Sequence, residues 1–270
     1  MTNSSPIPMP DIERYLEGKH AIVTGGSRGI GAAVAAGLVR RGADVTIMGR
    51  SAETLERKAA ELRGEPGATV AVEECDVADQ ASVTSAFARA TATLGPAYVL
   101  VNNAGIAKSR KLVDLTPDIW NETIAVNLTG TYLCTSEVIP GMIEARSGRI
   151  VNIASTAGLR GYRTMTAYAA SKHGVIGFTR ALALETAKLG ITVNAVCPAY
   201  ADTDMAADAV EALRTKLGKT EDEAMAMLTG TIPRGTLIRP DEVAGAVIWL
   251  CSPDASGVTG IAMPVAGGEV

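Results

Sequence analysis

The sequence has few aromatic residues, few histidines and no clustered cysteines. Aromatic residues make up 4% of the 270 positions, and the two histidines are His20 and His173. The four cysteines are widely separated, at Cys75, Cys134, Cys197 and Cys251. Without paired cysteines and with so few imidazoles, a structural or catalytic zinc site is not expected. Reduced, buried cysteines are instead typical of a cytoplasmic protein.

Positive charge and long apolar runs are also lacking. The net charge is −4 at pH 7, and no Lys/Arg cluster is interleaved with aromatic residues, which argues against nucleic acid and anionic membranes as partners. No apolar run reaches the roughly 18 residues of a membrane-spanning helix. The N-terminus has neither the basic start nor the apolar core of a signal peptide. Its prolines and serines predict a flexible arm over residues 1–17.

Hydrophobic residues are plentiful, at 47%, and they alternate between short strand-like runs and longer helical stretches. Strands are predicted at 20–26, 44–49, 69–77, 98–105, 148–155, 191–198 and 258–264. Helices are predicted at 30–42, 51–63, 79–94, 117–145, 166–189 and 240–251, and Pro140 is expected to bend or break the fourth. This alternation predicts an α/β fold in which helices flank a doubly wound, seven-stranded parallel sheet, as one domain over residues 18–270.

The alternation lapses near residues 199–235, where we expect a lid over the sheet edge that helps to choose the substrate. Its apolar residues Met205, Met225, Met227 and Leu228 are candidates for an adaptable inner surface. The alternative is that they form the buried stripe of two short helices.

A glycine turn, "TGGSRGIG" (24–31), follows the first predicted strand and precedes a helix. Glycines at Gly25, Gly29 and Gly31 permit a tight turn, and the next helix presents free N–H groups to an anion. The motif favours a dinucleotide's pyrophosphate, with a turn that binds no ligand as the alternative. Arg28 in this turn and Arg50 after the second strand suit a 2′-phosphate. We therefore expect NADP(H), with NAD(H) as the alternative if both arginines are only solvated surface charges.

Two tyrosines precede a lysine by four residues, in Tyr15–Lys19 and Tyr168–Lys172. A lysine on the same helix face as a tyrosine favours the phenolate and is expected to lower the tyrosine's pKa for acid/base chemistry. Only Tyr168 follows a strand that ends in a serine, Ser155, whose hydroxyl could hold a substrate oxygen. Taken alone, Ser155 is as well explained as a turn residue. His173 is expected on the exposed side of its helix.

Several motifs together resemble the short-chain dehydrogenases/reductases over residues 18–268. They are "TGGSRGIG", "NNAG" (102–105), Asn127 in "AVNLTG", Ser155 in "NIAS", "YAASK" (168–172) and "CPAYADT" (197–203). The resemblance implies a single-domain Rossmann fold, a homotetramer or homodimer, and hydride transfer between a nicotinamide and a carbonyl or alcohol carbon. The chain departs from the family pattern at Ala199 and Ala266, where glycine and aspartate are usual.

The same resemblance implies roles for individual residues. The catalytic residues would be Asn127, Ser155, Tyr168 and Lys172, with Asn127 supporting a proton-relay water. The cofactor would contact Gly25, Ser27, Arg28, Gly29, Ile30, Gly31, Arg50, Asp76, Val77, Asn103, Ala104, Gly105, Tyr168, Lys172, Pro198, Ala201 and Thr203. No metal is implied.

Local strings such as "NIASTAGLRG" look most like reductases of β-ketoacyl thioesters, including aromatic polyketide ketoreductases. The expected function is therefore an NADP(H)-dependent ketoreductase of the 3-oxoacyl-thioester type. Its substrate would be a small carbonyl compound, and CoA and carrier-protein thioesters are among the candidates. Basic residues near the cleft could attract such a carrier, namely Lys108, Arg110, Lys111, Arg160 and Arg163. The alternatives are a secondary-alcohol or hydroxyacyl dehydrogenase and, more remotely, a catalytically silent NADP(H)-binding sensor.

Overall fold

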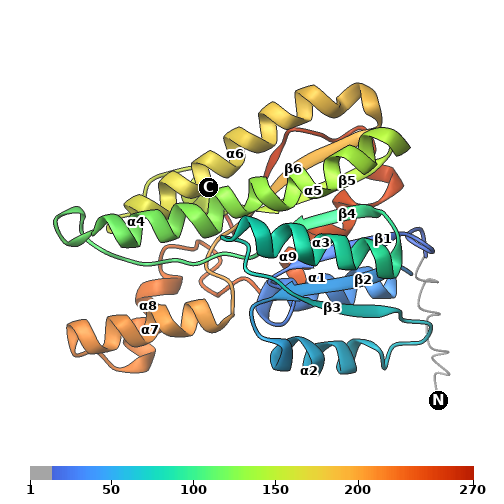
Figure 1. Ribbon diagram of the computed structural model, residues 1–270. Helices are drawn as coiled ribbons and strands as arrows, with labels where there is room; N and C mark the ends of the chain where they lie inside the picture. Colours follow the sequence, from blue (N-terminus) through green and yellow to red (C-terminus); the bar gives the residue numbers. More distant parts are fainter. Residues whose placement is uncertain (1–13) are drawn as a thin grey trace, which may run out of the picture.

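The computed structural model describes residues 14–270. Its core is one sheet of seven parallel strands in the order β3-β2-β1-β4-β5-β6-β7 (Figure 1). The strands are β1 His20–Thr24, β2 Asp44–Gly49, β3 Val70–Glu74, β4 Ala97–Asn102, β5 Gly148–Ile153, β6 Ile191–Pro198 and β7 Ala262–Val265. The order reverses between β1 and β4, so the sheet is wound in two halves, as predicted.

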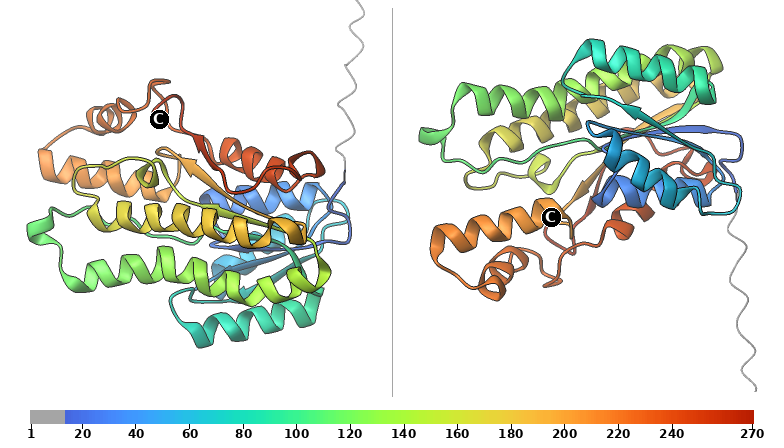
Figure 2. Two further views of the ribbon diagram at one scale, coloured as in Figure 1. Left: turned by 90° about the horizontal axis from the view of Figure 1, so that it is seen from above. Right: turned by 60° about the horizontal axis from the view of Figure 1, so that its bottom comes forward.

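Helices cover both faces of the sheet (Figure 2). One face carries α1 Gly29–Arg40, α2 Ala52–Leu62 and α9 Pro240–Leu250. The other carries α3 Gln80–Leu94, α4 Pro117–Ile124, α5 Gly130–Ala145 and α6 Thr166–Thr186. Two helices, α7 Asp204–Leu217 and α8 Glu221–Thr229, stand apart from both layers beyond the end of β6.

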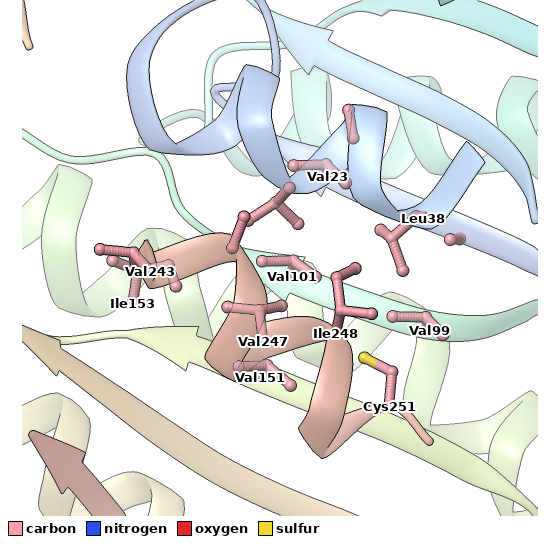
Figure 3. Close-up of a cluster of buried hydrophobic side chains, with 14 of the residues drawn as sticks. Val23, Leu38, Val99, Val101, Val151, Ile153, Val243, Val247, Ile248 and Cys251 are labelled. Carbon is pink, nitrogen blue, oxygen red and sulfur yellow. The ribbon is translucent and has the colours of Figure 1, made fainter. Parts of the chain in front are cut away.

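The largest core cluster lies where α1 and α9 cross the sheet (Figure 3). Val101 and Val151 of neighbouring strands and Val247 of α9 are 0–1% exposed. Each such side chain contributes about 1.5–3 kcal/mol by leaving water. The helices approach so closely that a Cβ on Gly37 would lie 2.9 Å from Ile248 Cγ1. This core holds the glycine turn at the start of α1 against the sheet.

The N-terminal arm predicted over residues 1–17 includes residues that belong to the folded domain. Residues 1–13 lie outside the described part of the chain, but residues 14–17 pack on the domain. Leu16 is 1% exposed, and Tyr15 Oη donates a hydrogen bond to the carbonyl of Ile248 at 2.9 Å. An apolar residue next to the first strand is buried here by α9, which a reading of prolines and serines alone does not anticipate.

The predicted helix over 117–145 is three elements rather than one bent at Pro140. A π-helical segment, Ala125–Thr129, separates α4 from α5, while Pro140 lies inside α5. The interruption surrounds Asn127, whose side chain has partners on another segment. Pro140 is exposed, so the helix continues past it without burying the resulting gap in its hydrogen bonds.

The segment near 199–235 contains two helices, and the predicted buried stripe forms only in part. Leu228 is buried between the helices and Met225 packs against this contact, whereas Met205 and Met227 lie outside it. The contact between α7 and α8 is built from Ala206, Val210, Ala224 and Leu228. Met205 and Met227 are 42% and 47% exposed. Small side chains allow these helices to pack closely, and Met205 and Met227 are left outside. In residues 14–270, no helix has the length and apolar character needed to cross a bilayer.

Candidate active site

The predicted catalytic residues meet at the carboxyl end of the sheet. Ser155 follows β5 by two residues, and Tyr168 and Lys172 lie one turn apart near the start of α6. Asn127 comes from the π-helical segment. Parallel strands all end at one edge, so residues distant in sequence converge there.

Lys172 is buried behind the tyrosine rather than solvated. It is 4% exposed, and its Nζ donates a hydrogen bond to the carbonyl of Ile153 at 2.7 Å. Nζ also lies 5.7 Å from the centre of the Tyr168 ring. The last carbonyl of β5 therefore holds the ammonium close to the phenol, in the place the spacing predicted.

The predicted lowering of the tyrosine pKa is wrong for this state of the protein. Burial raises the pKa of Tyr168 to about 12, although the neighbouring Ser155 hydroxyl acts in the opposite direction. Burial likewise lowers the pKa of Lys172 to about 8. Both groups are removed from water, which disfavours phenolate and ammonium alike. The Lys172 ammonium, one helical turn from Tyr168, does not offset the effect of desolvation on the tyrosine's pKa.

Asn127 ties the π-helical segment to two other parts of the site. Its Oδ1 accepts a hydrogen bond from the N–H of Ile106 at 2.8 Å, and its Nδ2 donates to the Ile106 carbonyl at 2.9 Å. Nδ2 also donates to Ser171 Oγ, which in turn donates to the carbonyl of Tyr168. Ser171 is one site residue that the sequence analysis did not identify, although it lies within the motif "YAASK". Asn127 therefore links the loop after β4 to α6.

The glycine turn has no room for side chains. Gly25 and Gly29 have positive φ values of 64° and 53°. A Cβ on Gly31 would lie 2.2 Å from the carbonyl oxygen of Gly25. Asn103 Nδ2 donates hydrogen bonds to the carbonyls of Thr24 and Gly25, both at 3.0 Å. The turn is thus a cradle of bare backbone at a helix N-terminus, which fits the pyrophosphate of a dinucleotide.

Thr24, at the end of β1, is a second residue missed from sequence. Its Oγ1 accepts hydrogen bonds from the N–H groups of Asn103 and Ala104, at 3.0 and 3.1 Å. This joins the first strand to the predicted wall of the cofactor cleft. Gly105 lies beside both predicted catalytic groups of this region, since a Cβ there would be 3.2 Å from Asn127 Oδ1 and 3.6 Å from Lys172 Nζ.

The two arginines predicted to share a phosphate are both exposed. Arg28 Nη1 lies 2.9 Å from Asp204 Oδ2, at the start of α7. Arg50 is exposed and forms no ion pair within residues 14–270. Asp76 and Val77, predicted at the adenine, follow β3 next to this edge, with Asp76 half-buried.

The chain after β6 packs against the glycine turn. Thr203 lies against the glycine turn, since a Cβ on Gly29 would be 3.0 Å from its Cγ2. Ala201 is buried and bridges to Ile238. Ala199 is not among the residues of the described chain with positive φ, so it replaces the usual glycine without backbone strain. Of the remaining predicted cofactor residues, Ser27 belongs to the glycine turn, Ile30 to the first turn of α1 and Pro198 to the end of β6.

The other candidates separate from the site. Tyr15 and Lys19 do not face each other, because Lys19 Nζ lies over the Tyr98 ring at 5.0 Å. His173 is exposed, as predicted. All four cysteines are free and buried, and residues 14–270 hold no group of three or more metal-ligating side chains. Of the basic residues near the cleft, Lys108 pairs with Glu122 and Arg160 with Glu269.

Comparisons with known proteins agree with this geometry. A family model described as short chain dehydrogenase matches residues 19–214. Putative ketoacyl reductase 1 of the granaticin polyketide synthase from Streptomyces violaceoruber is 41% identical over 250 residues, 92% of either chain. The 3-oxoacyl-(acyl-carrier-protein) reductase FabG of Pseudomonas aeruginosa is 42% identical over 255 residues, covering 94% of this chain and 98% of its own. A crystal structure of a single-residue variant of actinorhodin polyketide ketoreductase with NADPH is 40% identical, covers 93% of this chain and 97% of its own, and has a TM-score of 0.90.

Proposed function

The chain belongs to the short-chain dehydrogenase family, and we propose that it is an NADP(H)-dependent ketoreductase acting on 3-oxoacyl thioesters. The observation that carries the proposal is the buried Lys172 ammonium held behind Tyr168, with Ser155 beside the phenol. A catalytically silent nucleotide sensor would not need a lysine 4% exposed at this position. Relatives whose names give ketoacyl substrates support the substrate class.

The roles of the site residues follow from their chemistry. NADPH, when bound, supplies the hydride that adds to the carbonyl carbon. The carbonyl oxygen then needs a proton, which Tyr168 Oη donates as the C–O π bond breaks and the alcohol O–H bond forms. Ser155 Oγ donates a hydrogen bond that holds this oxygen in place. Lys172 stabilises the resulting phenolate and, through its remaining N–H groups, binds the cofactor ribose.

The raised pKa of Tyr168 suits this direction of the reaction. Because burial raises the pKa of Tyr168 to about 12, its phenol is protonated at neutral pH and available as a proton donor. Oxidation of an alcohol would need the phenolate instead, and the positive charge of the oxidised nicotinamide would favour it. A hydroxyacyl dehydrogenase is therefore the second candidate.

The cofactor preference rests on the glycine turn and its arginine. The turn's bare backbone fits a pyrophosphate, and the Arg28 side chain, 77% exposed, is held by an exposed ion pair with Asp204. A guanidinium forms forked hydrogen bonds to a phosphate, whereas a ribose hydroxyl offers it much less. The end of β2 carries Gly49 and Arg50 instead of the acidic residue that binds a free 2′-hydroxyl. These residues favour NADP(H) over NAD(H).

We also propose a homo-oligomer, a dimer or a tetramer, located in the cytoplasm. Apolar side chains are exposed on α4, α5 and α6, which lie side by side over one face of the sheet (Figure 2). Free, buried cysteines support the reducing compartment. Docking a carrier protein would bring its negatively charged phosphopantetheine arm to the cleft mouth, where Arg110 and Arg163 are exposed.

The experiment that tests this function is a substrate screen with both cofactors. NADPH oxidation is followed with acetoacetyl-CoA, a carrier-bound 3-oxoacyl thioester and a panel of cyclic and aromatic ketones. The proposal expects thioester turnover with NADPH well above that with NADH. Turnover of simple alcohols with NADP⁺ but not of thioesters would favour the dehydrogenase. Tight NADPH binding without turnover on any carbonyl would contradict the enzyme assignment.

A further inference from the structure

One ion pair joins the glycine turn to the start of the lid. Arg28 Nη1 donates to Asp204 Oδ2 at 2.9 Å, across 176 positions in the sequence. The contact has a second component, because the methyl group of Thr203 faces Gly29 in the same turn. The first residues of α7 are therefore seated on the surface that is predicted to receive the cofactor's phosphates.

The pair occupies the guanidinium that the proposed function assigns to the 2′-phosphate. A carboxylate and a phosphate cannot both take the same N–H donors of Arg28 without repelling each other. The 2′-phosphate carries close to two negative charges and offers more acceptor oxygens, so it is the stronger partner. NADPH therefore competes with Asp204 for Arg28, whereas NADH, which has no 2′-phosphate, leaves the pair in place.

Asp204 has a favourable position to return to when Arg28 leaves. It is an acidic residue in the first turn of α7, where the positive end of the helix dipole stabilises a carboxylate. Both side chains of the pair are largely exposed, at 77% for Arg28 and 68% for Asp204. Exposed pairs contribute little to stability, so breaking this pair costs little free energy.

We propose that Asp204 is a specificity-determining residue that competes with the cofactor's 2′-phosphate for Arg28, and that the pair ties the start of the lid to the glycine turn until NADPH binds. This inference rests on the proposed NADP(H) function. It predicts that the chain binds NADPH less tightly than its arginines alone would allow. It also predicts that NADPH frees the first turn of α7, whereas NADH does not.

The test is direct binding of each cofactor to the full chain, measured by titration calorimetry. Asp204→Asn removes the competing charge and keeps the side chain's size. We expect the Kd for NADPH to fall about twofold to fivefold and that for NADH to stay unchanged. The gain should shrink in high salt. The control is Asp208→Asn, which removes one charge from the next turn of α7 and should change neither Kd.

Variants of Arg28 separate failure of this inference from failure of the proposed function. Arg28→Ala should weaken NADPH binding, and adding Asp204→Asn in that background should have no effect. If Arg28→Ala leaves the ratio of the Kd for NADPH to the Kd for NADH unchanged, the proposed cofactor role of Arg28 is wrong. If Arg28→Ala weakens NADPH but Asp204→Asn alone matches the original chain, the competition is overturned.

A second readout needs no cofactor. If the pair ties the lid, Arg28→Ala should speed amide hydrogen exchange severalfold in the first turn of α7, without changing any residue of that helix. Exchange in α8 is the internal reference. Unchanged exchange in α7 would show that the pair does not hold the lid, whatever its effect on binding.

Discussion

At the scale of single residues, the buried lysine sets the pH range of the proposed reaction. Burial lowers the pKa of Lys172 to about 8, so the ammonium is present below that pH and lost above it. Tyr168 stays protonated up to about pH 12 and does not limit the same range. We therefore expect kcat/KM for NADPH in ketone reduction to fall as pH rises through about 8. Profiles of kcat/KM with NADPH as the varied substrate report the free enzyme.

Lys172→Arg is the matched control for that limb. A guanidinium stays charged to beyond pH 12, so any activity this variant retains should lose the fall near pH 8. NADPH binding at pH 7 and pH 9.5, followed by fluorescence, gives the same comparison if turnover is too slow to measure. An unchanged limb in this variant would assign it to a group other than Lys172.

The buried carboxylate of Glu269 makes a second residue-scale prediction. Its side chain is 1% exposed, one oxygen accepts from Arg160 Nη2 at 2.8 Å, and the other has no partner within the described chain. Arg160→Ala should lower the free energy of unfolding by about 1–3 kcal/mol, because it leaves the carboxylate without its donor. Adding Glu269→Gln should recover part of the loss. Chemical denaturation measures both, and equal losses in single and double variants would contradict the account.

Residue-scale chemistry was only partly predictable. The Tyr168–Lys172 spacing correctly predicted which side chains meet. It gave the wrong direction for the tyrosine's pKa, because burial is a property of the folded environment. Similarly, the sequence assigns Arg28 to the glycine turn. Its ion-pair partner Asp204 lies 176 positions away, and no local sequence pattern indicates this pair.

At the scale of elements, the glycine turn has strict steric limits. Gly31→Ala would place a Cβ 2.2 Å from the Gly25 carbonyl oxygen, so the turn must open. We expect a loss of about 1–3 kcal/mol in stability and a large loss of NADPH affinity. Gly245→Ala is the control, since nothing lies within 4 Å of a Cβ there and α9 should gain up to about 1 kcal/mol. Thermal unfolding with and without NADPH makes the comparison, and equal behaviour of the two variants would refute the steric argument.

Elements were predictable where the apolar pattern alone defines them. The strands at 44–49 and 191–198 begin and end where predicted, because their runs are buried on both faces. The interruption at Asn127 was not, since a helix-forming sequence continues through it. The π-helical segment is stabilised by hydrogen bonds to Ile106 and Ser171, and these exist only after the elements have packed.

At the scale of the whole molecule, large apolar side chains are exposed on three helices that cover one face of the sheet. Trp120, Tyr132, Ile143 and Leu184 are 37%, 54%, 42% and 85% exposed on α4, α5 and α6. The proposed oligomer would cover such side chains with another copy of the chain. We expect a mass of two or four times 27.8 kDa by light scattering.

Leu184→Glu should shift that mass toward a smaller species, because it places a charge on the exposed face of α6. Leu217→Glu, at an exposed leucine of the lid helix α7 that is 47% exposed, is the control and should leave the mass unchanged. A monomer at micromolar concentration in the original chain would contradict the proposed oligomer without touching the chemistry of the site.

The most direct test of the central claim is the turnover of Tyr168→Phe beside Tyr15→Phe. Each variant removes one hydroxyl from a Tyr-x-x-x-Lys pair, but only Tyr168 has the lysine beside it. We predict that Tyr168→Phe binds NADPH normally and loses about 10²–10⁴-fold in kcat, the contribution of a positioned proton donor. Tyr15→Phe should keep its turnover. Near-normal kcat in Tyr168→Phe would contradict the proposed mechanism.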